Sequence, residues 1–575
     1  MAHLSLHEVS PLLERHLTEL LNRQITKLAD PCFGTVIDPA LGIPQPQASA
    51  QLATLSIFQM LLNDSPEEAL IEQASWALDG VLGLLRPTGR IDLSTVNIDS
   101  GPDTAFMVQY LCGVVELVRE LASTTLSNAL APLLERLEAI IRHTVPGMLT
   151  GGFHTPNHRW VLVAALVQAA KLFPDLDVTA GVAAYLAEGF DIDPEGTFIE
   201  RSVGVYDAVN TRSLLLIAAN WPNETVQNEA LEAVRRNLDF NIHLLHADGS
   251  AETGLSLRQD YGTRQVATGL IPSLLLFNRL RPSDQALALA CHLWQHSQGA
   301  NGHLTWLLYA LLRAGEPPLD ELPEASLPTD FTRHFPLNGI WRVRHGLLSA
   351  SAFEGVTRIF GLTFGEAELT SMKISHTYFG GHCGHFLVDR LTVTEAGRGK
   401  NGEASQVLLH SAGLGKERRP GYELPLGRPV SPTKWREALP QRALRTLPPI
   451  VGELTITEIQ QEGIAGFDLH YVTQDGEAGV ATQIAFDFPP GGIWETDDSR
   501  LQPVAGQVIF LKRGTGEMRF HNDLIRIRSG AYAHGMWAMR EAEEAPKHVR
   551  VLLTFMTPVD CHIQIWCERG GWETK

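Results

Sequence analysis

Hydrophobic residues recur every three to four positions over the first half of the chain, which is the spacing of amphipathic helices. One stripe runs through Leu13, Leu17 and Leu20, and a later one lies within residues 231–245. The stretch from Trp160 to Ala170 is apolar all round, and a helix without a polar face must be covered on every side. We therefore predict an all-α domain over residues 1–315, with about a dozen helices in concentric layers.

The hydrophobic period falls to two in the second half of the chain. Ile525 and Ile527 alternate with arginines, and the same alternation occurs within residues 562–565, as in half-buried strands. Between the two halves, residues 316–336 contain five prolines, a density that no regular helix or central strand tolerates. We predict a Pro-rich linker over 316–336 and an antiparallel β-sandwich over 337–575.

Composition narrows the class of protein. The 575 residues exceed the roughly 250–300 at which one core stops growing, which fits two domains. A formal net charge of −19 disfavours nucleic acid and anionic membranes as partners. The six cysteines are scattered without a CxxC pair, so neither a disulfide framework nor a zinc ribbon is indicated, and no cofactor is expected. The N-terminus lacks a secretory pattern and no stretch is apolar enough for a membrane span, so we expect a cytoplasmic protein.

Four polar loops lead directly into apolar helices, at residues 97–106, 151–160, 195–212 and 248–264. The second carries Asn157-His158-Arg159 at the start of the most apolar helix. Each loop taken alone is also explained by helix capping or by a satisfied core side chain. Four loops of the same form, however, predict one ring of polar residues around a cavity.

Candidate catalytic side chains in this ring are Asn157, His158 and Tyr206, and His376 in the strand half is a fourth. Two more histidines, His382 and His385, flank Cys383, but their spacing is poor for binding one ion, so no metal site is predicted. The candidates for substrate binding are Asn97, Asp103, Arg159, Trp160, Glu200, Asn210, Arg212, Arg258, Tyr261, Arg264, Tyr378 and Tyr422.

Three segments occur in a fixed order along the chain: Pro-Asn-His-Arg-Trp, then Glu-Gly-x-Phe-x-Glu-x-Ser with a following Tyr, then Ser-His-x-x-Phe-Gly. This set resembles the heparinase II/III-like polysaccharide lyase superfamily, in which an incomplete α/α toroid precedes an antiparallel β-sandwich. Where the family has His-Gly-His-x-Asp, this chain has Ser-His-Thr-Tyr at 375–378. The resemblance implies that Asn157 neutralises a uronate carboxylate, that Tyr206 transfers protons, and that His376 reaches across the domain cleft.

The chemistry of β-elimination needs the same kinds of residue. Removing the C5 proton of a uronate builds negative charge beside its carboxylate, and one donor that stabilises such charge is worth about 10²–10³ in rate. Asn157 suits this task, with Arg159, Arg212 or Arg264 as charge partners for the sugar acid. In a syn elimination Tyr206 acts as base and then as acid. In an anti elimination His158 or His376 is the base and Tyr206 the acid, and the sequence leaves both pathways open.

The function predicted is therefore a lyase that cleaves a glycosidic bond to a uronic acid in an oligosaccharide or polysaccharide and leaves a C4–C5 double bond. One alternative is a glycoside hydrolase, with two carboxylates about 5–10 Å apart drawn from Glu200, Glu252, Asp103 and Asp260. Another is a non-catalytic carbohydrate-binding protein.

Some finer expectations accompany this prediction. We expect short oligosaccharides to be preferred over polymers, and His376 to lie at the domain interface facing the helical domain. Tyr422 and His410 are weaker candidates for the same interface. The uronate, the linkage and a homo-oligomeric state stay open.

Overall fold

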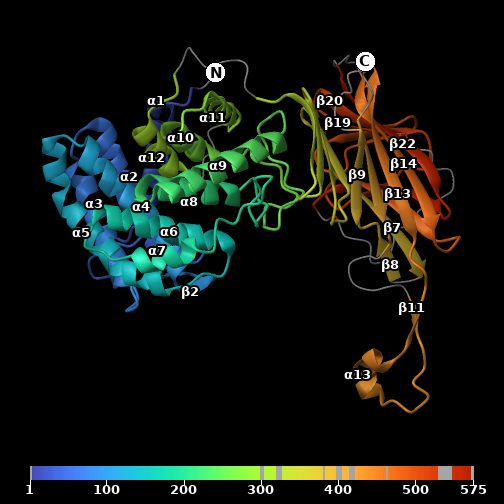
Figure 1. The fold of residues 1–575 in the computed structure, drawn as a ribbon, viewed down its shortest axis with the longest axis horizontal. Helices are drawn as coiled ribbons and strands as arrows, with labels where there is room; N and C mark the ends of the chain where they lie inside the picture. The colour runs from blue at the N-terminus through green and yellow to red at the C-terminus, as the bar shows by residue number, and fades with distance from the viewer. Residues whose placement is uncertain are drawn as a thin grey trace. The chain divides into compact units, whose positions relative to one another are not determined.

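The structure is a computed structural model that describes residues 3–297, 303–318, 327–379, 382–395, 405–413, 421–461, 464–528, 545 and 547–570. The chain divides into two compact units, Met1–Leu327 and Pro328–Lys575 (Figure 1). Within the described residues, no helix combines the length and the apolarity needed to cross a bilayer.

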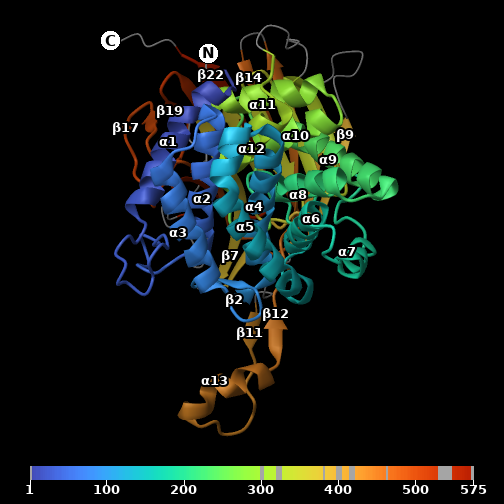
Figure 2. The same ribbon diagram turned by 90° about the vertical axis from the view of Figure 1, so that its left-hand side faces the viewer.

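The first unit is built from two layers of helices (Figure 2). The inner helices are almost wholly buried, whereas the outer ones are buried on one face. The inner layer comprises α2 (Pro46–Asn63), α4 (Gly101–Leu121), α6 (Pro156–Leu172), α8 (Tyr206–Asn220), α10 (Leu270–Leu280) and α12 (Leu304–Ala314). The outer layer comprises α1 (Leu6–Asn22), α3 (Glu68–Leu84), α5 (Thr124–Thr150), α7 (Thr179–Leu186), α9 (Glu224–Leu244) and α11 (Asp284–His296).

Each inner helix packs against the next one, and α12 returns to α2 and α4, so the inner layer forms a ring. This arrangement confirms the predicted α/α toroid. It also explains why α6 is apolar all round, because its residues from Asn157 to Ala169 are all buried.

The inner helices run in the same direction, because their first turns touch one another. Gln47 at the start of α2 donates to the Asp103 carbonyl of α4, and Phe106 of α4 packs edge-on against His158 of α6. At the other side of the ring, Thr305 of α12 accepts from Gln51 of α2. The N-termini of the inner helices therefore lie at one end of the toroid, where their partial positive charges favour an anion.

In the described part of the chain, the second unit is a sandwich of two nine-stranded sheets, which confirms the predicted fold class. One, the β7 sheet, has the order β18 (Val508–Phe510), β21 (Val549–Met556), β15 (Ala481–Phe488), β7 (Ala367–Phe379), β6 (Phe360–Phe364), β5 (Leu348–Phe353), β4 (Ile340–His345) and β3 (Asp330–Phe335), with β8 (His382–His385) also paired to β7. The other, the β14 sheet, has the order β17 (Arg500–Leu501), β16 (Ile493–Thr496), β19 (Thr515–Phe520), β20 (Asp523–Arg528), β22 (Asp560–Arg569), β14 (Ile464–Asp475), β13 (Val451–Gln461), β10 (Gln406–Ser411) and β9 (Arg390–Glu395).

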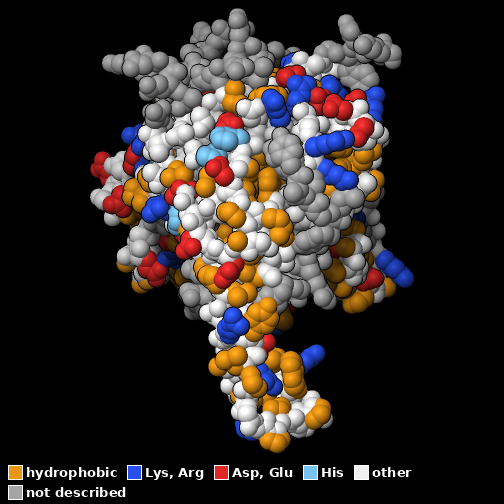
Figure 3. Space-filling view, turned by 90° about the vertical axis from the view of Figure 1, so that its right-hand side faces the viewer, with side chains coloured by type: hydrophobic (Ala, Val, Ile, Leu, Met, Phe, Trp, Pro, Cys, Tyr) orange, Lys and Arg blue, Asp and Glu red, His pale blue; other side chains and the backbone are white. Residues whose placement is uncertain are grey.

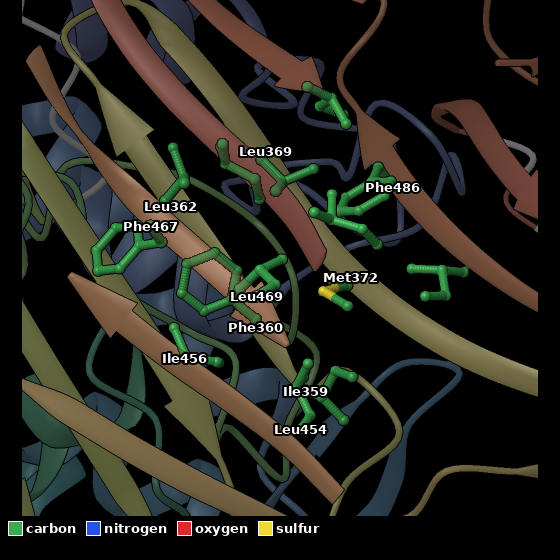
Figure 4. Packing of buried hydrophobic residues seen from close by; sticks show 14 of the residues in the cluster. Ile359, Phe360, Leu362, Leu369, Met372, Leu454, Ile456, Phe467, Leu469 and Phe486 are labelled. Carbon is green, nitrogen blue, oxygen red and sulfur yellow. The ribbon is translucent and has the colours of Figure 1, made fainter. Parts of the chain in front are cut away.

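Neighbouring strands are antiparallel, apart from β18 and β21, which pair in parallel. Phe360, Phe467 and Phe486 pack with aliphatic side chains between the two sheets (Figure 4). One detail of the prediction was wrong: β3 lies inside the segment assigned to the linker. The six-residue strand lies between Pro328 and Pro336, and a short edge strand tolerates prolines at its ends.

A small arm extends from the sandwich (Figure 1, Figure 2). Its strands β11 (Gly421–Glu423) and β12 (Leu444–Thr446) form a separate two-stranded sheet, and the short helix α13 (Trp435–Ala438) lies between them. Hydrophobic side chains cover part of its surface (Figure 3). Among them, Trp435 is 50% exposed and Tyr422 is 48% exposed.

Candidate functional site

Polar side chains from the loops before α6 and α8 and from residues 246–269 form a buried network at the N-terminal end of the inner helices. Glu200 links two of these helices. Its Oε1 accepts a hydrogen bond from the backbone N–H of Asn157 at 2.7 Å, and its Oε2 accepts from Nδ2 of Asn210 at 3.2 Å. Glu200 is 3% exposed and satisfies an otherwise orphaned N–H in the first turn of α6. Its role is therefore to hold the starts of α6 and α8 in place.

The Asn157 side chain is held in one orientation. Its Oδ1 accepts a hydrogen bond from the Thr155 hydroxyl at 2.9 Å. Its Nδ2 is enclosed and has no hydrogen-bond partner within the described residues. An amide with a fixed oxygen and an unused NH₂ group is prepared to donate to an anionic ligand.

The His158 ring lies beside Asn157 and is kept neutral. Burial, and then the nearby His154 ring, lower the pKa of His158 to about 4, although Asp103 acts in the opposite direction. Nδ1 of His158 is enclosed without a hydrogen-bond partner in the described part of the chain. At neutral pH this histidine is therefore an uncharged imidazole that is able to accept a proton.

Tyr206, the first residue of α8, has its hydroxyl fixed by two neighbours. Nη2 of Arg258 donates to it at 2.9 Å, and Nε2 of Gln259 donates at 3.2 Å. The Arg258 guanidinium also lies over the Tyr206 ring, 4.3 Å from its centroid. A hydrogen bond from a guanidinium stabilises the phenolic oxygen whenever that oxygen carries negative charge. Arg258 is near His158 as well, since its charge contributes to the lowered pKa of that ring.

Ser202 and Asp260 connect the loop before α8 to the loop that carries Arg258. Oγ of Ser202 accepts from the Tyr206 N–H at 3.2 Å and donates to Oδ2 of Asp260 at 2.9 Å. Oδ1 of Asp260 accepts from the Ser256 hydroxyl. These bonds fix Tyr206 and Arg258 relative to each other, which is what a positioned proton-transfer group requires.

Asp207 was not among the predicted site residues, although it follows Tyr206 directly. It is 1% exposed and accepts from Nδ2 of Asn237 at 3.1 Å. Burial above all, followed by the nearby charges of Glu200 and Asp260, raises the pKa of Asp207 to about 7, while amide hydrogen bonds act in the opposite direction. Gln259 and His154 were also missed, because nothing in their local sequence separates them from other residues of the polar loops. Ser202 belongs to the Glu-x-Ser motif of the resemblance, but no role was assigned to it.

Several predicted binding residues have other tasks in the structure. Trp160 is fully buried and packs against Phe190 with ring centroids 5.0 Å apart, so its assignment to substrate binding was wrong. Arg159 forms ion pairs with Glu188 and Asp191, which neutralise the charge that was assigned to a sugar acid.

Two further binding candidates of the helical unit, Arg264 and Asn97, also have partners within the protein. Arg264 pairs with Asp248 at 3.0 Å, and Nδ2 of Asn97 donates to Oδ2 of Asp103 at 2.8 Å. Tyr261 differs from these, because it is 43% exposed.

His376, the catalytic candidate of the sandwich, lies inside it. On β7, the side chains of Met372, Ile374 and His376 alternate onto one face, and the first two belong to the core between the sheets. The His376 ring is 1% exposed and Nδ1 lies 2.9 Å from the Thr482 hydroxyl on the paired strand β15. Burial lowers its pKa to about 3. The predicted position at a domain interface was therefore wrong, because the ring points into the sandwich.

The remaining residues of the sandwich carry structural contacts. The Tyr378 hydroxyl accepts from the Ile450 N–H at 2.9 Å, Tyr422 lies on the arm, and His410 pairs with Asp389 at 2.6 Å. The side chains of His382 and Cys383 lie outside the described residues. Among the residues that are described, no group of three His, Cys, Asp or Glu side chains could hold a metal ion.

The arrangement of a helical toroid followed by an antiparallel sandwich is the fold of a class of polysaccharide lyases. No family model and no curated protein sequence matches the chain, but solved structures do. Heparinase III is similar with a TM-score of 0.53 at 10% identity, over 97% of this chain and 84% of that one. A xanthan lyase from Paenibacillus is similar with a TM-score of 0.53 at 10% identity, over 98% of this chain. This chain spans 57% of that longer enzyme. At this level of identity the likeness establishes the fold.

Proposed function

We propose that this protein is a polysaccharide or oligosaccharide lyase that cleaves a glycosidic bond to a uronic acid by β-elimination. The observation that carries the proposal is the Tyr206 hydroxyl, held by Arg258 and Gln259, together with two unused polar groups, Nδ2 of Asn157 and Nδ1 of His158. Arg258 joins them, because its charge also acts on His158. The fold shared with heparinase III and a xanthan lyase supports it. The N-termini of the inner helices add a potential that favours an anionic sugar.

In the proposed reaction, the substrate carboxylate accepts a hydrogen bond from Nδ2 of Asn157, which stabilises the enolate-like charge that develops when C5 loses its proton. Tyr206, as a phenolate stabilised by Arg258, takes that proton. The bond between C4 and its oxygen then breaks, the C4–C5 double bond forms, and the Tyr206 hydroxyl protonates the leaving oxygen. If the C5 proton lies on the other face of the ring, His158 is the base and Tyr206 remains the acid.

The carboxylates offer less support for a hydrolase. A hydrolase needs two carboxylates that face the scissile bond. Glu200, Asp260, Asp103 and Glu252 are each 3–4% exposed, and each accepts hydrogen bonds from nearby loops or helix starts. These four carboxylates are structural acceptors, whereas Nδ2 of Asn157 and Nδ1 of His158 have no hydrogen-bond partner in the described part of the chain.

The test is a screen of glycans that contain glucuronate, iduronate, mannuronate or galacturonate, followed by ultraviolet absorbance, because the new double bond absorbs and a hydrolysis product does not. Tyr206→Phe should lose several orders of magnitude in rate, while Tyr309→Phe, which removes a 2.9 Å hydrogen bond to Glu116 of α4 instead, serves as the matched control. New reducing ends without absorbance would identify a hydrolase. Binding without any product would identify a carbohydrate-binding protein.

We further propose that short oligosaccharides are the preferred substrates. A viscosity assay on a long uronate polymer tests this, since rapid loss of viscosity means cleavage within the polymer. In that case the preference for short chains is wrong, and the lyase assignment is unaffected.

A further inference from the structure

Arg212 on α8 is a buried cation without a counter-charge. Its side chain is 3% exposed, and within the described residues it makes no hydrogen bond or ion pair. The guanidinium lies over the ring of Trp306 of α12 in a cation–π interaction, with 4.4 Å between the guanidinium carbon and the ring centroid.

Other deeply buried arginines of this protein are compensated. Arg159 meets two carboxylates. Arg342 donates to Ser349 and Ser351 at 2.9 Å each, and Arg550 binds both oxygens of Asp487 at 2.7 and 2.9 Å. Arg212 differs from these because the contact with Trp306 replaces only a small part of the hydration that a buried guanidinium loses.

The surroundings of Arg212 leave it charged. Burial lowers its pKa to about 9, so it keeps its proton at neutral pH. The nearby His303, at the start of α12, is neutral there, because burial and then the charge of Arg212 lower the pKa of His303 to about 4. His303 also lies against Gly269 at the start of α10. Arg212 therefore lies by the N-terminus of α12, and His303 joins that helix start to the N-terminus of α10. Both helix ends add positive potential.

We propose that Arg212 forms a second anion subsite in the toroid, which binds a carboxylate or a sulfate group on a substrate sugar other than the one that reacts. The proposal rests on the proposed lyase function for the identity of the substrate. Two observations carry it: the unpaired guanidinium, and the helix starts on the α10–α12 side of the ring. Within the described residues, Arg212 contacts Trp306, whereas Tyr206 bonds to Arg258 and Asn157 bonds to Thr155, so the subsite is separate from the reacting groups.

The experiment compares the full-length protein with Arg212→Met by thermal unfolding in sodium glucuronate, in sodium sulfate and in sodium chloride at equal ionic strength. Glucuronate or sulfate should raise the Tm of the wild type above its value in chloride, and Arg212→Met should lose this shift. Which of the two anions raises the Tm distinguishes a carboxylate subsite from a sulfate subsite. An equal shift in both proteins, or no shift in either, overturns the proposal.

Stability without added anion provides a second measurement. Removing an uncompensated buried charge should raise the Tm of Arg212→Met by a few degrees. The matched variant Arg159→Met should lower it, because that change leaves two carboxylates unpaired. A lower Tm for Arg212→Met as well would mean that Arg212 is a structural cation, and would overturn the proposal.

The two proposals fail in different ways. With a lyase substrate, Arg212→Met should raise KM by about 10- to 100-fold and change kcat little. A product that absorbs ultraviolet light, formed with an unchanged KM, would refute the subsite and support the lyase proposal. A Tm shift by anions that depends on Arg212, without any product from the uronate screen, would support the subsite and refute the lyase proposal.

Discussion

Arg258 provides the sharpest test of how Tyr206 is activated. Replacement by methionine removes the 2.9 Å hydrogen bond to the Tyr206 hydroxyl and the cation 4.3 Å from its ring. A hydrogen bond to a charged group is worth about 1.5–3 kcal/mol, and the cation–π contact about 0.5–1 kcal/mol. If both act mainly in the transition state, the loss is about 2–4 kcal/mol, or about 30- to 1000-fold in kcat.

Initial rates of ultraviolet absorbance on the best glycan from the uronate screen measure this loss. Arg264→Met, which breaks a 3.0 Å pair with Asp248 instead, is the control. Arg258→Lys should recover part of the rate, because an ammonium still donates one hydrogen bond. The methionine variant should also move the acid limb of the pH profile upward, since the charge of Arg258 helps to lower the pKa of His158.

The reasoning is refuted by one clear result. If Arg258→Met keeps the wild-type kcat while Tyr206→Phe is inactive, Tyr206 works without the guanidinium. A change in KM alone would show instead that Arg258 binds substrate equally well before and during the reaction.

Three further predictions concern the supports of the site and the sandwich. Asp207 has a raised pKa of about 7 in the folded protein. The stability that it contributes is therefore complete below about pH 4 and is lost as the pH rises through 7. Denaturant titrations should show that the unfolding free energy of Asp207→Asn depends less on pH than that of the wild type. The lowered pKa of His376, about 3, costs stability as the pH falls below about 6.5, so His376→Leu should resist acid better, while an unchanged acid midpoint would contradict this account. Trp160→Ala should lose about 3–5 kcal/mol of unfolding free energy, and a loss below about 1 kcal/mol would place this side chain outside the packed core.

The fold was largely predictable because the spacing of hydrophobic residues indicates which face of each helix or strand is buried. The apolar run after Trp160 indicated a helix covered on every side, and α6 is one. The same reasoning was available for His376, because Met372, Ile374 and His376 share one parity on a strand. The predicted role of His376 rested on the chemistry of the imidazole and not on this parity. The strand β3 was missed for a different reason. Five prolines in residues 316–336 argue against regular structure, but the six residues of β3 contain none of them and form an edge strand.

The site was predictable as a set of loops, but not as a set of roles. Asn157, Tyr206 and Arg258 come from three of the polar loops. Asn157 bonds to Glu200 and Arg258 bonds to Tyr206, and the charge of Arg258 acts on His158, the neighbour of Asn157. Arg159 and Arg212 look alike in the sequence, each in the first turns of a buried helix. Only the three-dimensional structure distinguishes them, because the carboxylates that neutralise Arg159 lie about thirty residues further along the chain.

The arm between β11 and β12 bears on how this fold can change. Its two strands pair with each other and with no strand of either nine-stranded sheet in the described part of the chain. Shortening, lengthening or exchanging the segment between Gly421 and Thr446 therefore breaks no ladder of the sandwich and opens no part of its core. The arm is a place where the sequence is free to vary in length, and where a tag or a foreign peptide can be inserted while both sheets stay intact.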